Sequence, residues 1–277
     1  MNVNLFGRFI RIFILVIMGV FAFALLFPYL WMLSTSLKLD IDVFKTPMQW
    51  IPDPPQWKNY KAVWTKIPFL LYYFNTFKVT TLSTLLQLFV CSLAAYAFAR
   101  LRFRLKNVIF LLFLSTMMIP WYSIMIPQFM LVSKMRLYDT HASLILLQAF
   151  SAFGIFLLRQ FFMGIPMDMS EAARIDGCSE WRIFSRIILP LAGPGLATLS
   201  IFTFMRVWND YLAPLIYLQT PARQTIQLGL TYFISERTME YAVIMAGTVC
   251  ALFPIIAIYL FAEKYITQGI AFSGIKN

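Results

Sequence analysis

Charged residues are scarce in this sequence. They make up 13% of the chain, against about 25% in soluble globular domains. Six stretches contain no Asp, Glu, Lys or Arg, namely residues 12–37, 79–99, 107–133, 140–158, 187–205 and 241–262. Each comes close to or exceeds the roughly 20 apolar residues that a helix needs to cross a hydrocarbon core of about 30 Å. The scarcity of charge excludes an ordinary soluble domain and predicts an all-α membrane protein with six transmembrane helices.

Cysteine, histidine and glycine are also scarce, which excludes several kinds of chemistry. Cys91, Cys178 and Cys250 are dispersed without the spacing of a disulfide framework or metal site, and the single histidine lies at the end of a predicted span. We therefore expect no metal site. A phosphate-binding loop of the form GxxxxGK[ST] needs glycine followed by lysine, and none of the eleven glycines has lysine after it. Without that motif or a nucleophile–base cluster, the chain is not expected to be an enzyme.

Positive charge is the one kind of charge in excess, with a formal net charge of +11. In so apolar a chain we attribute the excess to the Lys and Arg residues that mark cytoplasmic loops, and we expect no nucleic acid partner. The densest cluster, Arg100, Arg102, Arg104 and Lys106, lies between the second and third spans. Placing it inside predicts that both termini and residues 163–193 are cytoplasmic, and that residues 40–66 are external.

Residues 1–69 form the predicted first domain, a transmembrane helix followed by an external loop rich in Pro and Trp. The apolar stretch of this helix is longer than the 7–15 residues typical of a signal-peptide core, so we expect it to be retained. The loop suits either a lid at the membrane interface or a docking surface for an external partner. Residues 70–263 form the predicted transmembrane domain with five helices, and residues 264–277 form a cytoplasmic tail.

Two charges, Arg206 and Asp210, fall within or beside the fifth span, at a depth where an unpaired charge costs at least about 2.5 kcal/mol. Two interpretations stay open. The residues form an ion pair inside the bundle, or they line a solute path together with Trp208, Asn209 and Tyr211. Gln128 is a further candidate for this path, because Pro120 and Pro127 are expected to kink the third span, either around a cavity or simply for packing.

Six charged side chains interrupt the apolar sequence in "EAARIDGCSEWRIFSRIILP", residues 171–190. Asp168 stands three residues before Glu171, the spacing of a capping box with Asp168 as the N-cap. Gly177 suits a left-handed helix terminator, and Ser179 can cap a second helix that runs to Pro190. We therefore predict a helix–turn–helix elbow between the fourth and fifth spans. Its first helix is too short to persist alone, so it must pack against a partner or its own bundle.

This stretch resembles the EAA loop of ABC importer permeases. The fixed positions of that pattern are filled by Glu171, Ala172, Ala173, Gly177, Ile187, Leu189 and Pro190, while Cys178 stands where alanine is usual. The segments "SLAAYAFARLRF", "FGIFLLRQFF", "WNDYLAPL" and "YITQGIAFSG" resemble the maltose-type, carbohydrate-importing permeases. The resemblance covers most of the chain beyond residue 70 and implies a type I ABC transmembrane domain with the elbow as its coupling helix.

The resemblance also implies partners and contacts. The residues expected to contact an ATPase subunit are Glu171, Ala172, Ala173, Arg174, Asp176, Gly177 and Cys178, with Gln268 and Gly269 in the tail. The expected partners are a second permease subunit in a heterodimer, two ATPase subunits, an extracellular or periplasmic solute-binding protein, membrane lipid and a sugar. The chain itself is expected to bind no cofactor, with ATP and magnesium on the ATPase. Its expected location is the inner membrane of a bacterial or archaeal cell, as a multi-pass protein.

The leading hypothesis is import of a sugar or oligosaccharide, and two alternatives remain. The same machine could import a sugar phosphate or glycerol phosphoester, which Arg206 would suit. An ion-coupled secondary transporter is the other alternative. Such transporters usually contain membrane-buried carboxylates and helices broken at matching positions of two halves. Here Asp210 is the one acid within a predicted span, and the halves do not match.

Overall fold

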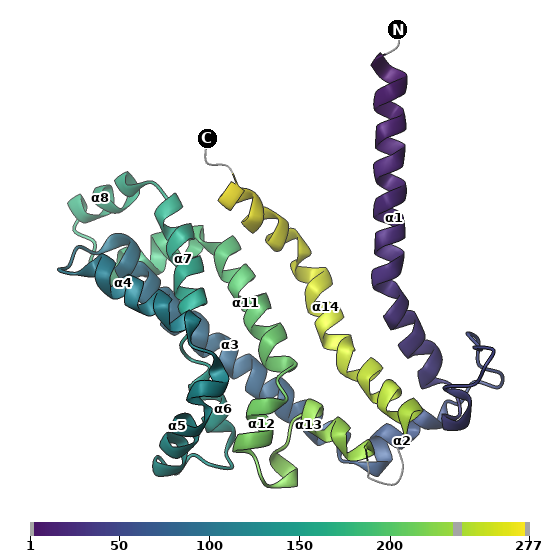
Figure 1. Ribbon diagram of the computed structural model, residues 1–277. Helices are drawn as coiled ribbons and strands as arrows, with labels where there is room; N and C mark the ends of the chain where they lie inside the picture. Colours follow the sequence, from purple (N-terminus) through teal and green to yellow (C-terminus); the bar gives the residue numbers. More distant parts are fainter. Residues whose placement is uncertain (1–2, 235–239, 275–277) are drawn as a thin grey trace. The chain divides into compact units, whose positions relative to one another are not determined.

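The computed structural model describes residues 3–234 and 240–274, with side chains described for residues 7–234 and 240–261. Within these residues the chain forms helices and no β-strand (Figure 1). The α-helices are α1 (Val3–Ser36), α2 (Lys58–Lys66), α3 (Phe69–Arg100), α4 (Lys106–Ser115), α5 (Trp121–Lys134), α6 (His141–Leu147), α7 (Ala152–Gly164), α8 (Met167–Ile175), α9 (Glu180–Ile183), α10 (Leu189–Leu191), α11 (Gly193–Trp208), α12 (Leu212–Tyr217), α13 (Ile226–Leu230) and α14 (Tyr241–Gly274).

Three described helices are long and apolar enough to cross a membrane alone, namely α1, α3 and α14. Three further candidate spans consist of helix pairs joined by a sharp bend. The bend is 101° between Lys106–Met118 and α5, 47° between α6 and α7, and 77° between Glu180–Leu191 and α11. Counting each pair as one span gives up to six. The all-α class is confirmed, and the number of spans stays a prediction.

Pro120 explains the largest of these bends. A proline disfavours helical backbone at the preceding residue, and Ile119 has an extended ψ of 114°. Pro120 itself takes a ψ of 135° and stands at the N-cap of α5. We expected two kinks in one helix. The structure instead has a break at Pro120, while α5 continues through Pro127.

The described residues group into two compact units, one formed by residues 1–69 and 230–253 and the other by residues 70–229 and 254–277. In the first unit, the Asn59 side-chain amide donates to the carbonyl oxygens of Ser36 and Lys38, at 2.9 and 2.8 Å, and so closes the end of α1. All side chains from Gly7 to Leu30 are exposed. An apolar helix whose surface is left uncovered within its own unit is suited to lipid or to further protein.

The core of the second unit joins α3, α7 and α11 with the helices around α8. Its fully buried members include Cys91, Leu158, Phe162 and Ile183. Gly195 permits a close approach of α11 to α7, because a Cβ there would lie 2.6 Å from the ring of Phe161. Small residues serve this purpose widely in membrane proteins, where they let helix backbones pack closely. This packing supports both regions described next.

Candidate functional site

The charged stretch forms a helix–turn–helix, which we call the elbow (residues 167–191). Gly177 adopts a φ of +77°, and two backbone bonds close the end of α8, from Gly177 N to Arg174 O at 3.0 Å and from Cys178 N to Ala173 O at 2.9 Å. This pair of bonds defines a Schellman motif, which a left-handed glycine favours. The Ser179 hydroxyl then accepts a hydrogen bond from Arg182 N at 3.4 Å and caps α9. The helix terminator at Gly177 and the N-cap at Ser179 thus have their predicted geometry.

The start of the elbow differs from the prediction. Pro166, with a ψ of 137°, occupies the N-cap position of α8, and no side chain caps this helix. Asp168 lies one residue inside the first turn, so it is not the N-cap of a capping box. A carboxylate in the first turn still interacts favourably with the helix dipole. The capping-box interpretation was wrong because the extended Pro166 takes the N-cap position, so the helix begins at Met167, two residues earlier than predicted.

One face of α8 has no cover within the described chain. Ile175 lies one turn after Glu171 and Ala172 along it, and all three are exposed, Ile175 by 86%. Ala173, by contrast, faces the core and is 7% exposed. Asp176 and Gly177 are exposed, and Cys178 is half-buried. Ile175 and the 60% exposed Trp181 were not among the predicted contact residues, although apolar residues within so polar a stretch could have identified them.

Ionic contacts hold the elbow together from within. Arg174 donates from Nε to Glu180 Oε1 at 2.7 Å, and Glu180 Oε2 accepts from the Tyr96 hydroxyl of α3 at 2.6 Å. The hydrogen bond to Glu180 raises the pKa of Arg174, so its guanidinium stays charged at all physiological pH values. Arg174 is therefore directed toward its own chain, although the sequence suggested it as an ATPase contact.

Arg100 is buried, unlike most charged residues next to a loop. Only 4% exposed, it donates from Nη2 to the carbonyl oxygens of Phe162 and Ile165, at 2.5 and 2.6 Å. Lys106 similarly donates to Ala99 O and Leu101 O, at 3.3 and 2.9 Å. Cations at helix C-termini satisfy the last carbonyl groups and interact with the dipole. Part of the basic cluster that we used to predict topology therefore caps helices.

A second polar region surrounds Arg206 near the end of α11. Its guanidinium donates to Gln148 Oε1, and from Nη2 to Gln87 Oε1 at 3.0 Å. The Gln87 amide in turn donates to the Thr203 hydroxyl at 3.0 Å. Neither glutamine was among the polar residues predicted from the sequence. Their position inside charge-free stretches was a usable signal, because an amide in a span needs a partner.

Arg206 and Asp210 form no ion pair among the described residues. The expectation of such a pair assumed a continuous helix, but α11 ends at Trp208. Asp210 therefore lies beyond the helix, where its Oδ1 accepts a hydrogen bond from Ala213 N at 3.1 Å at the start of α12. The ion-pair interpretation is wrong for this structure, because the break in the helix removes the one-turn spacing on which it depended.

The other predicted path residues separate into two groups. Asn209 is exposed, and its amide bonds to Met205 O at 2.9 Å, while Tyr211 is 36% exposed. Trp208 is completely buried, in ring contact with Tyr73 and Phe204. Gln128 accepts hydrogen bonds from Trp121 Nε1 and from the Tyr217 hydroxyl, both at 3.1 Å. Asn209 and Tyr211 are thus exposed and Asp210 is half-buried, whereas Trp208 is a packing residue.

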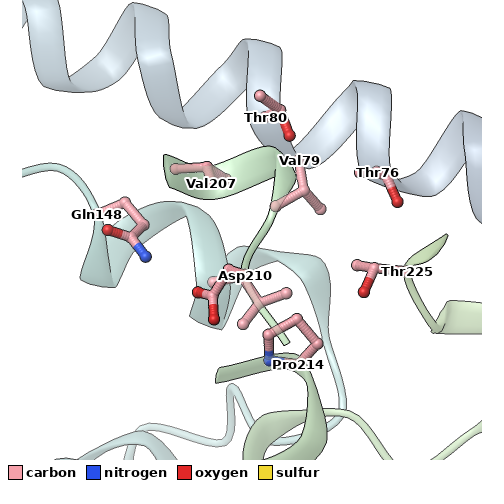
Figure 2. A pocket seen from close by; sticks show the side chains of 9 residues that line it. Thr76, Val79, Thr80, Gln148, Val207, Asp210, Pro214 and Thr225 are labelled. Atoms are coloured by element: carbon pink, nitrogen blue, oxygen red, sulfur yellow. The ribbon is translucent and has the colours of Figure 1, made fainter. Parts of the chain in front are cut away.

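Figure 2 shows a small hollow beside Asp210, lined by polar and apolar side chains of α3, α6, α11 and α12 and by Gln148, Asp210 and Thr225. Gln148 and Asp210 border it, together with Thr76, Thr80 and Thr225. The hydroxyl groups of Thr80 and Thr225 are buried, and neither has a hydrogen-bond partner among the described residues. A buried hydroxyl without a partner costs free energy, so this hollow favours a hydrogen-bonding occupant such as water.

A third cluster ties together the loops at residues 135–140 and 218–226. Asp139 Oδ1 accepts hydrogen bonds from the backbone N–H groups of Gln219 and Thr220, both at 2.9 Å. Its Oδ2 accepts from the Thr220 hydroxyl at 2.5 Å and pairs with Arg223 at 3.1 Å. The hydrogen bonds from Thr220 are the main cause that lowers the pKa of Asp139 to about 2. The carboxylate thus stays ionised and fixes both loops.

No group of three or more His, Cys, Asp or Glu side chains suited to a metal ion occurs among the described residues. The backbone of Gln268 and Gly269 lies in α14, and their side chains lie outside the described part of the chain. The two polar regions, the elbow and the surroundings of Arg206, are therefore the candidate sites.

Comparison with known proteins identifies the family. Residues 87–271 match the family described as "Binding-protein-dependent transport system inner membrane component". This match includes the elbow and all the predicted path residues. The chain belongs to this family.

Relatives of known name are similar over almost the full chain. The arabinooligosaccharides transport system permease protein AraQ of Halalkalibacterium halodurans is 31% identical over 92% of this chain and 93% of its own. The sn-glycerol-3-phosphate transport system permease protein UgpE of Yersinia enterocolitica is 34% identical over 93% of this chain and 94% of its own. The resemblance to carbohydrate-importing permeases is confirmed by relatives of this kind.

A solved structure shares the fold. A chain of a bacterial ABC transporter involved in the import of the acidic polysaccharide alginate aligns with a TM-score of 0.83 and 26% identity, over 94% of this chain and 97% of that one. The protein is accordingly a multi-pass inner-membrane permease subunit of an ABC importer. Permease subunits of this kind are not enzymes and bind no cofactor themselves. They work with a partner permease, an ATPase and a solute-binding protein.

Proposed function

We propose that this permease subunit moves a sugar or oligosaccharide into the cytoplasm, with ATP and magnesium bound and ATP hydrolysed on partner subunits. The relatives named for sugar transport support the class of solute. The single observation that carries the coupling mechanism is the elbow. One face of this helix pair packs on the core, and its outer face at Glu171, Ala172 and Ile175 is exposed. A soluble subunit with a complementary groove would provide that cover.

The topology that fits this function has six spans, both termini in the cytoplasm and the elbow between the fourth and fifth spans. The domain division is 1–69, 70–263 and 264–277. Support comes from the three long helices and three bent pairs, and from the basic residues between α3 and α4. We assign the protein to the cell membrane of a bacterium or archaeon, in a complex with a different permease, two ATPase subunits and an external solute-binding protein.

In this proposal the ATPase subunit contacts the elbow at Glu171, Ala172, Asp176, Gly177 and Cys178, with Ala173 and Arg174 supporting it from within. The tail at Gln268 and Gly269 provides a second contact. The substrate path includes Arg206, Asn209, Asp210 and Tyr211, near the hollow of Figure 2. Trp208 supports this path by packing. Gln128 extends it on α5. Hydroxyl-rich solutes suit side chains that both donate and accept hydrogen bonds.

One observation favours a second candidate, an anionic sugar or sugar phosphate. The Arg206 guanidinium is held by two neutral amides, and no described carboxylate pairs with it. The guanidinium is therefore not neutralised by a direct ion pair among the described residues and can attract an anionic group. The relative named for sn-glycerol-3-phosphate and the importer of an acidic polysaccharide carry anionic cargo.

Uptake by the reconstituted complex tests these proposals. Proteoliposomes containing this subunit, its partner permease, ATPase and solute-binding protein would be given neutral and anionic sugars, with and without ATP inside. We expect uptake only with ATP. Uptake driven by an ion gradient without ATP would support a secondary transporter and contradict the proposal. Preference for an anionic sugar that disappears in Arg206→Gln, with neutral uptake retained, would select the second candidate.

A further inference from the structure

α3 connects the elbow with the polar regions at the other end of the same compact unit. It continues through 32 residues without a break. Asn75 and Tyr96 lie 21 positions apart on it, which at about 1.5 Å per residue corresponds to about 31 Å. This distance matches the hydrocarbon thickness of about 30 Å. A single stiff element therefore runs across the unit, as the ribbon in Figure 1 illustrates.

At one end, α3 contacts both helices of the elbow. The Tyr96 hydroxyl donates to Glu180 Oε2 at 2.6 Å, and its ring lies edge-to-face with Phe184 at 5.2 Å. Glu180 is simultaneously bound by Arg174 of α8. Hydrogen bonds to a carboxylate are short and roughly twice as strong as neutral ones. Tyr96 is 5% exposed, so water has little access to this bond. The Tyr96–Glu180 contact thus joins α3 to the point where the two elbow helices meet.

The covalent routes out of the elbow are both interrupted. On the side of α7, the chain is extended at Ile165 and Pro166. On the side of α11, residues Phe184–Ile188 form a π-helix, and a 77° bend follows. Such interruptions are places where a helix changes direction, so they transmit a rigid displacement poorly. The contacts across space to α3 are a direct connection that these interruptions do not break.

Further along, α3 holds the surroundings of Arg206 and one of the loops. Gln87 of α3 accepts the hydrogen bond from Arg206. Asn75 donates to the carbonyl oxygens of Ala222 and Gln224, both at 2.9 Å, and the Thr76 hydroxyl accepts from Ile226 N at 2.8 Å. A displacement of α3 therefore reaches the candidate solute path and the loop at residues 222–226 together.

From these contacts we propose that α3 transmits movement of the elbow to the solute path, and that Tyr96 and Glu180 are the positioning residues of this connection. The inference rests on the proposed coupling role of the elbow and identifies the element through which that role is exerted. In this proposal α3 and the elbow move together. The bends beside α7 and α11 take up the resulting change of angle between the elbow and these two helices.

The first test is Tyr96→Phe, which removes only a hydroxyl group. The reconstituted complex would be assayed for assembly, for ATP hydrolysed and for solute imported per ATP. Changes within coupling networks alter coupling by a factor of about 2 to 30, so solute per ATP is expected to fall at least about threefold while assembly and ATP hydrolysis persist. Tyr60→Phe is the matched control, because Tyr60 shares a hydrogen bond of 2.8 Å with Ser36 inside the first unit, to which the elbow does not belong. That variant should keep the wild-type ratio.

A second test remains informative if Tyr96→Phe accumulates poorly. Tyr96→Cys and Glu180→Cys would be combined in a chain whose three native cysteines are replaced by serine. The pair should import little solute per ATP, and a short bifunctional thiol reagent should restore the ratio by rejoining α3 to the elbow. Cross-linking that stops uptake would overturn the proposal, because it would show that the two elements must move apart.

Glu171→Ala in the same assay separates this inference from the proposed function. Loss of uptake in Glu171→Ala with a wild-type ratio in Tyr96→Phe would leave the elbow as the coupling element and would overturn the role of α3. Wild-type uptake in Glu171→Ala would instead contradict the coupling role itself.

Discussion

At the scale of single residues, backbone conformation and hydrogen bonding decide what a side chain can do. Gly177 is needed for its φ of +77°, a region where other residues suffer contact between Cβ and the following carbonyl oxygen. Asp139 is needed for its two oxygens, which join two loops. Neither role requires contact with solute, so both can be tested through stability as well as uptake.

Gly177→Ala should destabilise the elbow by about 1–2 kcal/mol through backbone strain, because nothing lies within 4 Å of the added Cβ. Uptake per complex should fall, and Gly177→Asp should abolish it by adding charge at the proposed ATPase contact. Gly164→Ala is the control, since its site is equally open and lacks a positive φ. Equal unfolding temperatures and uptake for the Gly177→Ala and Gly164→Ala variants would contradict the argument.

Asp139 should make the unfolding temperature depend on pH in acid. Its folded pKa of about 2 lies below the ordinary value of 3.8, so ionisation favours the folded state. The contribution is fully present above pH 3.8 and disappears as the pH falls toward 2. The gap in unfolding temperature between wild type and Asp139→Asn, measured in detergent, should narrow over this window. A gap independent of pH would show that the carboxylate charge is not the cause.

At the scale of elements, the breaks in helices determine which polar groups meet. α11 ends at Trp208 and α12 begins at Leu212. Because of this interruption Asp210 accepts a hydrogen bond from the backbone of α12. Arg206 instead donates to Gln87 of α3 and to Gln148 in the α6–α7 connection. Arg206 therefore connects three segments, and its replacement should mainly weaken the packing of these segments.

Arg206→Gln should lower the yield of folded protein, and adding Asp210→Asn should not restore it. The reason is that Arg206 bonds to Gln87 and Gln148, so neutralising Asp210 returns no lost contact. Folded yield would be measured by size-exclusion chromatography in detergent for both single variants and the double variant. Recovery in the double variant would demonstrate an Arg206–Asp210 ion pair in the membrane.

Asn209→Leu tests the solute path at the end of α11. Loss of a hydrogen-bonding group is expected to cost about 1–3 kcal/mol, seen as slower uptake or a higher KM per assembled complex. ATPase assembly should stay unchanged, because Asn209 lies outside the elbow. Thr65→Val is the control, because it removes an exposed hydroxyl whose bond, to Lys61 O at 3.0 Å, lies within its own helix α2. Wild-type uptake by Asn209→Leu would place the solute on the partner permease.

At the scale of the whole molecule, the bilayer decides which segments face which side. The described helices contain three candidate spans and three bent pairs, and the elbow and the loop at residues 37–57 both present exposed residues. The basic residues after α3 predict that the elbow is cytoplasmic and that this loop is external. Two of these basic residues, Arg100 and Lys106, also bond to carbonyl groups at helix ends, so the orientation needs a direct test.

Single cysteines at Asp176 and Asp53, both exposed, should label differently in a chain without native cysteines. An impermeant thiol reagent added to intact cells should label Asp53→Cys at once and Asp176→Cys only after permeabilisation. The chain would be expressed without the ATPase, so that a bound partner does not protect position 176. Labelling of Asp176→Cys in intact cells would invert the topology.

The sequence by itself determined the helical class, the positions of the apolar segments and the turn at Gly177. These properties are local: lipid leaves backbone groups no partner outside the segment, and a left-handed terminator depends on a few neighbouring residues. The EAA pattern also identified the family from short-range spacing. Even local signals competed, however, as when Pro166 displaced Asp168 from the N-cap.

Only the tertiary structure decided the partners of the polar groups. Arg100 is buried against the end of α7, Tyr96 binds Glu180 across 84 positions, and Arg206 binds Gln87 across 119. A buried donor bonds to whichever acceptor the packing brings within about 3 Å, and this depends on helix breaks at Pro120 and Trp208. Composition and spacing along the chain do not contain those distances, so the ion pair expected between Arg206 and Asp210 did not form.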